Sequence, residues 1–334
     1  MEDKDSKPRF LLLNPPGELT FHRDYFCTLV SKSRYYYHPV DIVYLTGRLD
    51  KQFEVSVIDA IADRLSFEEC LEKVKEINPQ YMFFLIAAPS YSGDVSFIRE
   101  VKKNLPEVKI IGSGDVYREF RARALHDHDF LDAILLDFST EDILTYLNDA
   151  NGQVIDNVIY RHNGAVVEGP EKHGYGKFSL PVPRWDLFHL DEYRFPFARR
   201  LPFATILSDF GCPYSCTFCP ISTLGFKLRE IGEVIEEMKL VKSLGIKEFH
   251  FRDQTFGVNK KRTIELCDEM IKNGISVGWS CWSRVDVVNE ELLKKMKEAG
   301  CHTIIFGIET SNEEILKEYK KNIKVTQMVD ALKL

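Results

Sequence analysis

Short apolar runs alternate with helix-period segments along most of this 334-residue chain. In the first half, segments with an apolar residue at every third or fourth position, such as 67–77 and 95–105, predict helices. The apolar runs between them are continuous, which suits parallel strands buried on both faces; they cover residues 10–14, 55–58, 81–86, 108–111 and 133–136. The alternation predicts a doubly wound α/β domain over residues 1–145.

A doubly wound sheet binds its ligands at the carboxyl ends of the strands, near the point where the strand order reverses. In this chain the residues that follow the expected strands are mostly small or turn-forming, so a large ligand can approach the backbone there. The candidate ligand contacts of the first domain are therefore Asn14, Pro15, Pro16, Gly17, Pro89, Ser90, Gly112 and Gly114.

The second half of the chain repeats a strand followed by a helix four times, which predicts part of a β/α barrel over residues 201–334. The expected strands are 204–208, 248–251, 277–283 and 303–308, and the expected helices are 231–243, 262–272, 290–299 and 313–319. Active-site residues of such barrels cluster at the carboxyl ends of the strands. Polar residues follow these strands, among them Asp253, Arg284 and Glu309.

Residues 146–200 are expected to connect the two domains. The turn His162-Asn163-Gly164 between two apolar runs predicts a hairpin. The proline-rich stretch 181–196 that follows has a fixed, extended path and several large aromatic side chains to bury. We expect it to act as a strap across the domain interface.

Three cysteines with the spacing C-x-x-x-C-x-x-C, Cys212, Cys216 and Cys219, directly follow the first strand of the second half. Three thiolates from one loop can hold three irons of a 4Fe-4S cluster and leave the fourth iron open for a small-molecule ligand. A structural zinc site would need a fourth ligand, and no other Cys or His lies within a few residues.

A disulfide framework requires an oxidising compartment, whereas the chain opens with charged and polar residues in place of a signal peptide. A free cysteine surrounded by apolar residues behaves as a small buried hydrophobe. We therefore expect the remaining five cysteines to belong to the core: Cys27, Cys70, Cys267, Cys281 and Cys301.

The composition argues against two classes of partner. A net charge of -7 disfavours extended binding to a phosphate backbone, so no nucleic-acid partner is expected. No stretch approaches the roughly 18 apolar residues that a membrane-spanning helix needs. The expected location is the cytoplasm.

The cysteine spacing, with Phe218 directly before the last cysteine, resembles the cluster loop of the radical S-adenosylmethionine (SAM) superfamily. In that family SAM chelates the open iron through its amino and carboxylate groups, and reductive cleavage of SAM gives a 5'-deoxyadenosyl radical. The resemblance implies SAM contacts at Phe218, Asp253, Arg284 and Glu309. Asp253 would face the amino group, the fork of Arg284 would suit the carboxylate, and Glu309 would lie near the ribose.

Asp253, Arg284 and Glu309 could equally be salt-bridged residues of the barrel. No side chain can be named from the sequence as a general acid or base.

The order of elements in the first half resembles the cobalamin-binding domain that precedes the catalytic domain in one large radical SAM class. The signature of that domain is Asp-x-His-x-x-Gly after the first strand, but this chain has Asn14-Pro15-Pro16-Gly17, and His22 lies off the motif. Cobalamin bound here would lack a lower histidine ligand. The alternative is a flavodoxin-like domain without a ligand.

The resemblance implies an enzyme that methylates an unactivated carbon of a small-molecule, lipid or natural-product substrate. An electron donor such as flavodoxin or ferredoxin would reduce the cluster. Alternative outcomes are oxidation, cyclisation or carbon–carbon coupling, and a further alternative is a non-catalytic module that binds a cluster or a corrinoid.

The family's partial barrel normally has six strands, and this sequence ends in the helix that would lead to the fifth. We therefore expect a fragment of a longer enzyme, whose fourth strand would be a bare edge.

Overall fold

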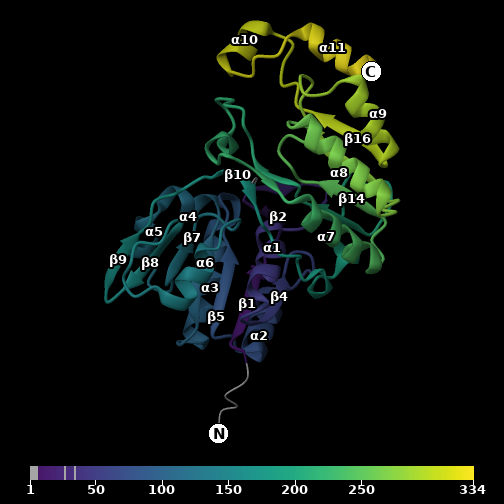
Figure 1. Cartoon of the computed structure of the whole chain (residues 1–334). Helices are drawn as coiled ribbons and strands as arrows, with labels where there is room; N and C mark the ends of the chain where they lie inside the picture. Colours follow the sequence, from purple (N-terminus) through teal and green to yellow (C-terminus); the bar gives the residue numbers. More distant parts are fainter. Residues whose placement is uncertain (1–6, 26–27, 34) are drawn as a thin grey trace. The chain divides into compact units, whose positions relative to one another are not determined.

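The computed structural model describes residues 7–25, 28–33 and 35–334 and divides into two compact units. The first unit contains the residues up to Lys172 and the segment Pro181–Tyr193, and the second contains His173–Leu180 and Arg194–Leu334. The segment 146–200, expected to be one connector, is thus shared between the units. Both units combine helices with parallel strands, as the sequence predicts for an α/β protein (Figure 1).

The first unit is built on a seven-stranded sheet with the order β4-β1-β5-β6-β7-β8-β9. Its five parallel strands are β1 (Arg9–Asn14), β4 (Glu54–Asp59), β5 (Tyr81–Leu85), β6 (Lys109–Ser113) and β7 (Ala133–Leu135). Because β1 lies between β4 and β5, the strand order reverses there, and this is the ligand-binding switch point of a doubly wound sheet.

The hairpin expected around His162-Asn163-Gly164 is present as β8 (Val158–His162) and β9 (Ala165–Glu168). It does not form part of a free connector, since β8 pairs antiparallel with β7 and extends the first sheet. The pairing satisfies backbone groups that an isolated hairpin would leave to water.

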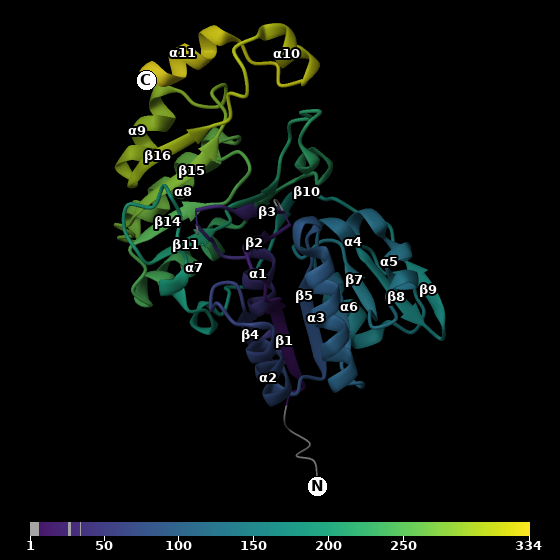
Figure 2. The ribbon, with the colours of Figure 1, turned by 180° about the vertical axis from the view of Figure 1, so that it is seen from behind.

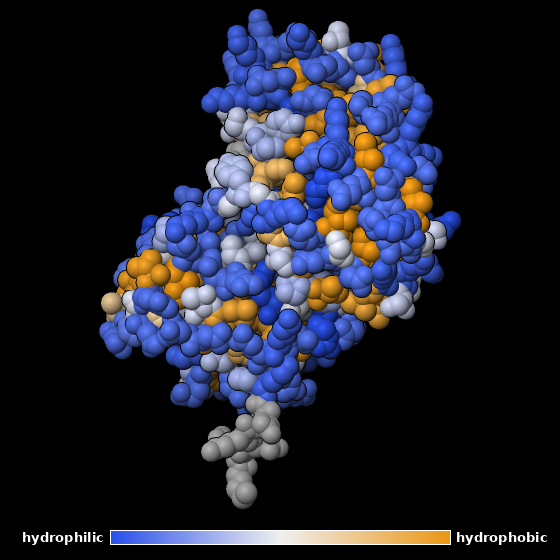
Figure 3. Space-filling view, in the orientation of Figure 1, coloured by the Kyte–Doolittle hydropathy of each residue, from blue (hydrophilic) through white to orange (hydrophobic). Residues whose placement is uncertain are grey.

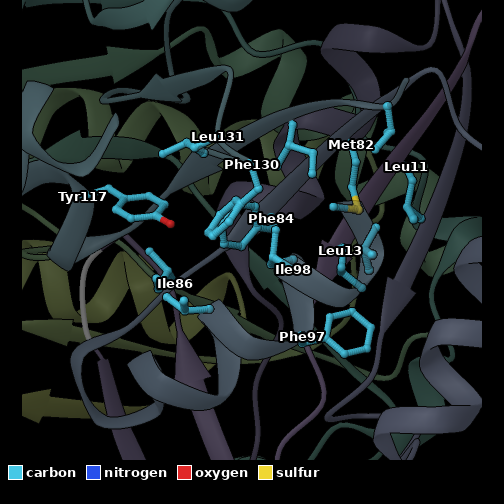
Figure 4. Close-up of a cluster of buried hydrophobic side chains, with 14 of the residues drawn as sticks. Leu11, Leu13, Met82, Phe84, Ile86, Phe97, Ile98, Tyr117, Phe130 and Leu131 are labelled. Carbon is cyan, nitrogen blue, oxygen red and sulfur yellow. The ribbon is translucent and has the colours of Figure 1, made fainter. Parts of the chain in front are cut away.

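Helices cover both faces of this sheet (Figures 1 and 2). They are α1 (Val40–Leu49), α2 (Phe67–Ile77), α3 (Tyr91–Asn104), α4 (Asp115–Phe120), α5 (Ala122–Asp127) and α6 (Asp142–Asp149). Side chains from one face of the strands pack against α2 to α5 in one buried cluster. Figure 4 shows Phe84 of β5 within this cluster, together with Phe97 and Ile98 of α3 and Tyr117 of α4.

The proline-rich segment Pro181–Tyr193 belongs to the first unit and packs on α1. A Cβ atom at Gly47 of α1 would lie only 2.5 Å from the carbonyl oxygen of Val182, so the close approach of the two backbones requires glycine. Trp185 and Tyr193 are fully buried, and their rings contact His38. This packing explains why all ten residues of α1 are buried.

The second unit contains a parallel sheet with the order β11-β14-β15-β16, as expected for successive β/α units. Its strands are β11 (Phe203–Ile206), β14 (Glu248–Phe251), β15 (Gly278–Ser283) and β16 (Cys301–Phe306). The helices that follow them are α7 (Ile231–Ser243), α8 (Lys260–Lys272), α9 (Glu290–Glu298), α10 (Glu313–Glu318) and α11 (Val325–Lys333).

A small sheet of the same unit supports the cysteine loop. Its strands are β10 (Tyr175–Phe178), β12 (Asp209–Gly211) and β13 (Phe226–Arg229), in the order β10-β13-β12. The antiparallel pairing of β12 with β13 fixes the two ends of the loop that contains the three cysteines.

Polar side chains cover much of the molecular face seen in Figure 3, with smaller apolar areas between them. Among the described residues, no helix is long and apolar enough to span a membrane.

Candidate functional site

The cysteine loop starts at the end of β12 and is closed by two glycines. The backbone N–H of Cys212 donates to the carbonyl oxygen of Gly225 at 3.0 Å, which joins the two arms of the loop. Gly211 and Gly225 both have positive φ angles, of 82° and 69°, and a Cβ atom on Gly211 would overlap the Gly225 carbonyl. Only glycine fits this crossing without strain.

A cavity of about 270 Å³ lies beside this loop, and all three cysteines line it. Phe218, Arg284 and Glu309, which the sequence suggests as SAM contacts, line the same cavity. They come from the loop and from the segments after β15 and β16, so the strand ends converge as expected for a barrel. The other lining residues are Tyr214, Gln254, Thr255, Trp282, Ser283, Ile305, Phe306, Gly307 and Lys321.

The three thiols do not converge on a single point. Among the described residues, no three His, Cys, Asp or Glu side chains are close enough together to hold one metal ion. Zinc would draw thiolates to within about 2.3 Å of one ion, whereas a cubane cluster distributes three thiolates over three irons. Three thiolates match the cluster in number, whereas a structural zinc site takes four ligands.

The surroundings of the cysteines are mixed in polarity. The Sγ atom of Cys212 lies 3.5 Å from Oγ1 of Thr255, and burial raises the pKa of the Cys212 thiol. Nη1 of Arg284 lies 3.6 Å from Sγ of Cys216 and brings a positive charge to that sulfur. All cysteines of the described part of the chain are free, and Cys27 lies outside it.

Contacts with neighbouring side chains hold Arg284 in the wall of the cavity. Its Nε and Nη2 atoms each donate to one carboxylate oxygen of Asp286 at 2.9 Å, and its guanidinium stacks on the ring of Tyr214 at 3.8 Å. The side chain is only 7% exposed. Such a bidentate pair is geometrically specific and holds both partners in place.

Asp253 lies beside the cavity rather than in it. Its Oδ1 accepts from the backbone N–H groups of Ser208 and Asp209 at 2.7 and 3.1 Å, and its Oδ2 accepts from the Ser208 hydroxyl at 2.5 Å. These bonds tie the residue after β14 to the end of β11. The structure therefore does not bring Asp253 together with the other expected SAM contacts.

Two buried carboxyl groups meet at this position. Burial raises the pKa of Asp253 to about 6. The pKa of Asp209 is raised well above its usual range, first by burial and then by the neighbouring Asp253 carboxylate. Burial and the repulsion between the two neighbouring charges both favour retention of a proton by this pair.

Glu309 and Lys321 form an ion pair in the cavity wall. Nζ of Lys321 lies 3.0 Å from Oε1 of Glu309, and Glu309 adopts a left-handed backbone conformation with a φ of 66°. A positive φ in a residue other than glycine, asparagine or aspartate is uncommon and often marks a functional position.

Sequence reasoning missed Lys321, as well as Tyr214 and Trp282. Tyr214 lies within the cysteine loop and Trp282 lies in β15 shortly before Arg284, so their position next to expected site residues was an available signal. Lys321 had no such signal, because a pair of lysines usually marks a solvated surface.

The first unit has a larger cavity, of about 610 Å³, at the carboxyl ends of β1 and β5. Of the candidate ligand contacts, Pro16, Gly17, Pro89 and Ser90 line it. Apolar side chains of its wall come from Leu19, Phe21, Leu65, Phe67 and Tyr91, and the charged residues Glu18, Arg23, Glu68 and Asp94 also line it. The switch point of a doubly wound sheet is the usual place for a cofactor.

The other candidate contacts of the first unit do not line this cavity. Asn14 donates through Nδ2 to Oδ1 of Asp59 at 2.8 Å and is fully buried. Side chains on Gly112 and Gly114 would overlap the ring of Tyr117 and the carbonyl oxygen of Ile86. The fold itself therefore fills the space beside these two glycines.

An unexpected hairpin places a buried arginine at the same cavity. Its strands are β2 (Thr20–Arg23) and β3 (Thr28–Ser31). Nη2 of Arg23 lies 2.7 Å from Oδ1 of Asp94, and both side chains are fully buried. Arg23 also donates to Oδ1 of Asn14 and to the Pro15 carbonyl, both at 2.9 Å, so it crosses the switch point.

His22 of this hairpin does not line the cavity. Its ring packs against those of Tyr36 and Tyr37, and its Nε2 lies 2.9 Å from the Tyr35 carbonyl oxygen. None of the described residues that line the cavity of the first unit is a histidine.

Several known proteins, including the following two, match most of the chain. An uncharacterised methyltransferase from Pyrococcus horikoshii is 31% identical over 309 residues, which cover 88% of this chain and 66% of that protein. An anaerobic magnesium-protoporphyrin IX monomethyl ester cyclase from Cereibacter sphaeroides is 25% identical over 315 residues, which cover 89% of this chain and 51% of that protein. The chain thus spans between about half and two thirds of the length of these relatives.

A solved structure has a similar fold. The radical SAM methyltransferase TsrM from Kitasatospora setae, with its tryptophan substrate and a SAM analogue bound, superposes with a TM-score of 0.74. The two chains are 18% identical, and the match covers 97% of this chain and 65% of TsrM. The likeness includes both units, since little of the chain is left out.

A family model, the radical SAM superfamily, matches residues 208–334, which include the cysteine loop and the cavity beside it. The chain therefore contains a domain of the radical SAM superfamily, over residues 208–334.

Proposed function

We propose that Cys212, Cys216 and Cys219 hold a 4Fe-4S cluster and that SAM binds in the adjoining cavity. The observation that carries the proposal is that all three cysteines line one cavity with residues from the ends of neighbouring parallel strands. When bound, the cluster and SAM supply a 5'-deoxyadenosyl radical after one-electron reduction. Flavodoxin or ferredoxin would serve as the electron donor.

The residues of this chain shape and close the site. Phe218 and Tyr214, both within the cysteine loop, line the cavity, and the guanidinium of Arg284 stacks on the ring of Tyr214. Glu309 presents a carboxylate to the cavity, where it can accept a hydrogen bond from a ligand hydroxyl or amino group. Asp253 holds the end of β11 in place from behind the cavity and is not proposed to contact SAM.

We further propose that the first unit binds cobalamin in its cavity of about 610 Å³. The cavity lies at the switch point of a doubly wound sheet, and a second structure of TsrM contains both cobalamin and a 4Fe-4S cluster. The contacts would come from Pro16, Gly17, Pro89 and Ser90. The proposal includes no imidazole ligand from the protein on cobalt, because His22 lies off the Asp-x-His-x-x-Gly motif and none of the described residues that line the cavity is a histidine.

The proposed reaction is methylation of a carbon atom of a small-molecule substrate. The methyltransferase relative from Pyrococcus and the similarity to TsrM support it. A second candidate is ring formation, which the similarity to the Cereibacter cyclase supports. Product mass distinguishes them, because methylation adds one methyl group whereas oxidative ring formation removes hydrogen.

The first experiment tests the cluster. After anaerobic reconstitution, the wild-type protein should contain iron and sulfide and show the absorption of a 4Fe-4S cluster. Changing Cys212, Cys216 or Cys219 to Ala should abolish both, because each thiolate holds one iron. Cys301→Ala, in β16 of the same unit, is the matched control and should keep the cluster.

Stoichiometric zinc without iron–sulfur absorption in anaerobically prepared protein would contradict the proposal. A cluster that survives in all three cysteine variants would do the same.

A further inference from the structure

Thr255 follows β14, and its hydroxyl oxygen Oγ1 lies 3.5 Å from the Sγ atom of Cys212. The residue lines the cavity and is only 4% exposed. A buried hydroxyl is costly unless it forms a hydrogen bond. Within the part of the chain that the structure describes, the sulfur of Cys212 is the one hydrogen-bond partner of this hydroxyl.

The chemistry of the cysteine decides which of the two atoms donates. A hydroxyl can donate or accept, and a thiol can do the same. A cysteine that holds iron is a thiolate without a proton, so its sulfur can only accept. In the cluster-loaded protein, Thr255 is therefore the donor, and its hydroxyl proton lies toward the negatively charged sulfur of Cys212.

The neighbours of Thr255 along the chain hold it in this position. The carboxylate of Asp253 accepts from the backbone N–H of Asp209 at 3.1 Å, which ties the segment to β12 at the start of the cysteine loop. The backbone N–H of Phe256 donates to the carbonyl oxygen of Trp282 at 2.9 Å, which ties it to β15. A donor that is already fixed loses little conformational entropy when its bond forms.

Cys216 receives a donor from the next strand end. Nη1 of Arg284 lies 3.6 Å from its sulfur. This guanidinium also pairs with Asp286 and stacks on Tyr214, so its replacement would change the wall of the cavity as well. Thr255 is therefore the residue at which the effect of a single hydrogen bond to sulfur can be isolated.

A hydrogen bond to a cysteine sulfur should change how easily the cluster is reduced. Reduction adds one electron from the flavodoxin or ferredoxin and lowers the net charge of the cluster by one, and no bond is broken. The irons and their sulfur ligands share the added charge, so a donor to sulfur stabilises the reduced form more than the oxidised form. Hydrogen bonds to sulfur are among the factors that set the potential of an iron–sulfur cluster.

We infer that Thr255 donates a hydrogen bond to the Cys212 thiolate and thereby raises the reduction potential of the cluster. This inference rests on the proposed function, because it assumes that the three cysteines hold a 4Fe-4S cluster. Thr255 is a positioning residue, since it acts on the cluster through Cys212.

The test measures the reduction potential of the cluster without SAM, by electron paramagnetic resonance at controlled potentials with dithionite as the reductant. Thr255→Val removes the hydroxyl and keeps a side chain of similar shape. At a given potential, the ratio of reduced to oxidised cluster should fall by about three- to tenfold, and a tenfold fall corresponds to about 59 mV for a one-electron couple. The iron and sulfide content should not change, because all three thiolates remain.

Thr263→Val is the matched control. Thr263 of α8 is also buried in the second unit, and its hydroxyl donates to the carbonyl oxygen of Asn259 at 3.0 Å instead of to a sulfur. This variant should keep the wild-type potential. Thr255→Ser, which retains a hydroxyl at the same position, should also stay close to the wild type.

A Thr255→Val cluster with the wild-type potential would overturn the inference. An equal fall in potential in Thr263→Val or in Thr255→Ser would do so too. If Thr255→Val does not load iron, Thr255→Ala takes its place with the same expectation. A wild-type protein that loads no iron–sulfur cluster would instead contradict the proposed function.

Discussion

The role of a charged residue in the second unit depends on the partners that surround it in the folded protein. Arg284 and Asp253 both follow strands of the second unit, where barrels place active-site groups. The guanidinium of Arg284 donates to Asp286 and stacks on Tyr214. The carboxylate of Asp253 accepts from the backbone N–H groups of Ser208 and Asp209. Lys321, which no motif singles out, is paired with Glu309 in the cavity wall.

Asp209 provides a pH-dependent prediction at this scale. Its pKa is raised in the folded protein by burial and by Asp253, so the folded state keeps a proton that the unfolded state releases above about pH 4. The free energy of unfolding therefore contains a contribution that is present at low pH and is lost as pH rises. Asp209→Asn, which has no proton to lose, should gain stability relative to wild type as pH rises from 4 to 7, by up to about 1.4 kcal/mol per pH unit.

The measurement is the urea midpoint of the metal-free proteins at several pH values. Asp129→Asn is the control, because Asp129 is exposed on the first unit. A difference between Asp209→Asn and wild type that is the same at every pH would contradict the expected burial of a protonated Asp209.

At the scale of elements, the hairpin of β2 and β3 shows how one buried ion pair can fix a surface insertion. Arg23 reaches from β2 to Asp94 in the first turn of α3 and to Asn14 at the end of β1. The hairpin is also held by the Tyr25 N–H, which donates to Oδ2 of Asp41, and by the Thr28 hydroxyl, which donates to Oδ2 of Asp115. The Arg23 guanidinium is a fully buried attachment among these.

Removing one partner of this ion pair should be strongly destabilising. Arg23→Met leaves the Asp94 carboxylate buried without its counter-charge, so we expect a loss of about 3–5 kcal/mol in the free energy of unfolding. The double variant Arg23→Met/Asp94→Asn should recover part of this loss, because it also removes the buried charge. Urea unfolding followed by circular dichroism measures both effects.

Arg64→Met is the matched control, since Arg64 forms an exposed pair with Glu192 in the same unit. Exposed pairs contribute about 0–1 kcal/mol. If Arg23→Met unfolded at the same urea concentration as this control, the hairpin would not depend on the buried pair.

At the scale of the whole molecule, each of the two units has a cavity of its own. The cavity with the cysteines is lined by residues of the second unit, and the larger cavity at β1 and β5 is lined by residues of the first. The two proposed cofactors should therefore be removable one at a time.

Gly93→Trp tests this independence. Gly93 lines the cavity of the first unit, and a Cβ atom there would meet no heavy atom within 4 Å, so the indole can fill the cavity without an initial clash. The variant should no longer retain hydroxocobalamin but should load the same amount of iron. Cys216→Ala should show the opposite pattern.

Gly232→Trp is the matched control, because Gly232 also has open space and lies at the start of α7 in the second unit. It should keep both cofactors. Retention of hydroxocobalamin by Gly93→Trp with wild-type affinity would show that the corrinoid does not use this cavity. A wild-type protein that retains no hydroxocobalamin would favour the scaffold without a ligand.

The sequence by itself determined the order of the elements and the chemistry of the cysteine loop. The parallel strands of both units and most of their helices lie where the hydrophobic periodicity predicts them, because strand and helix spacing are local properties of the chain. The spacing of the three cysteines is local as well, and it restricts the possible metal groups before any fold is known.

Only the tertiary structure decided which polar residues are available to a ligand. The charged residues in question lie near strand ends or in the segment after α10: Asp253, Arg284, Glu309 and Lys321. The sequence does not show which of these charges is already paired within the protein and which can still bind a ligand. Their roles depend on burial and on partners brought from distant segments, such as Ser208 for Asp253 and Glu309 for Lys321. The same holds for Gly112, whose open side is filled by the ring of Tyr117. A side chain's hydrogen-bonding capacity is set by its own chemistry, but how much of that capacity remains for a ligand is set by packing.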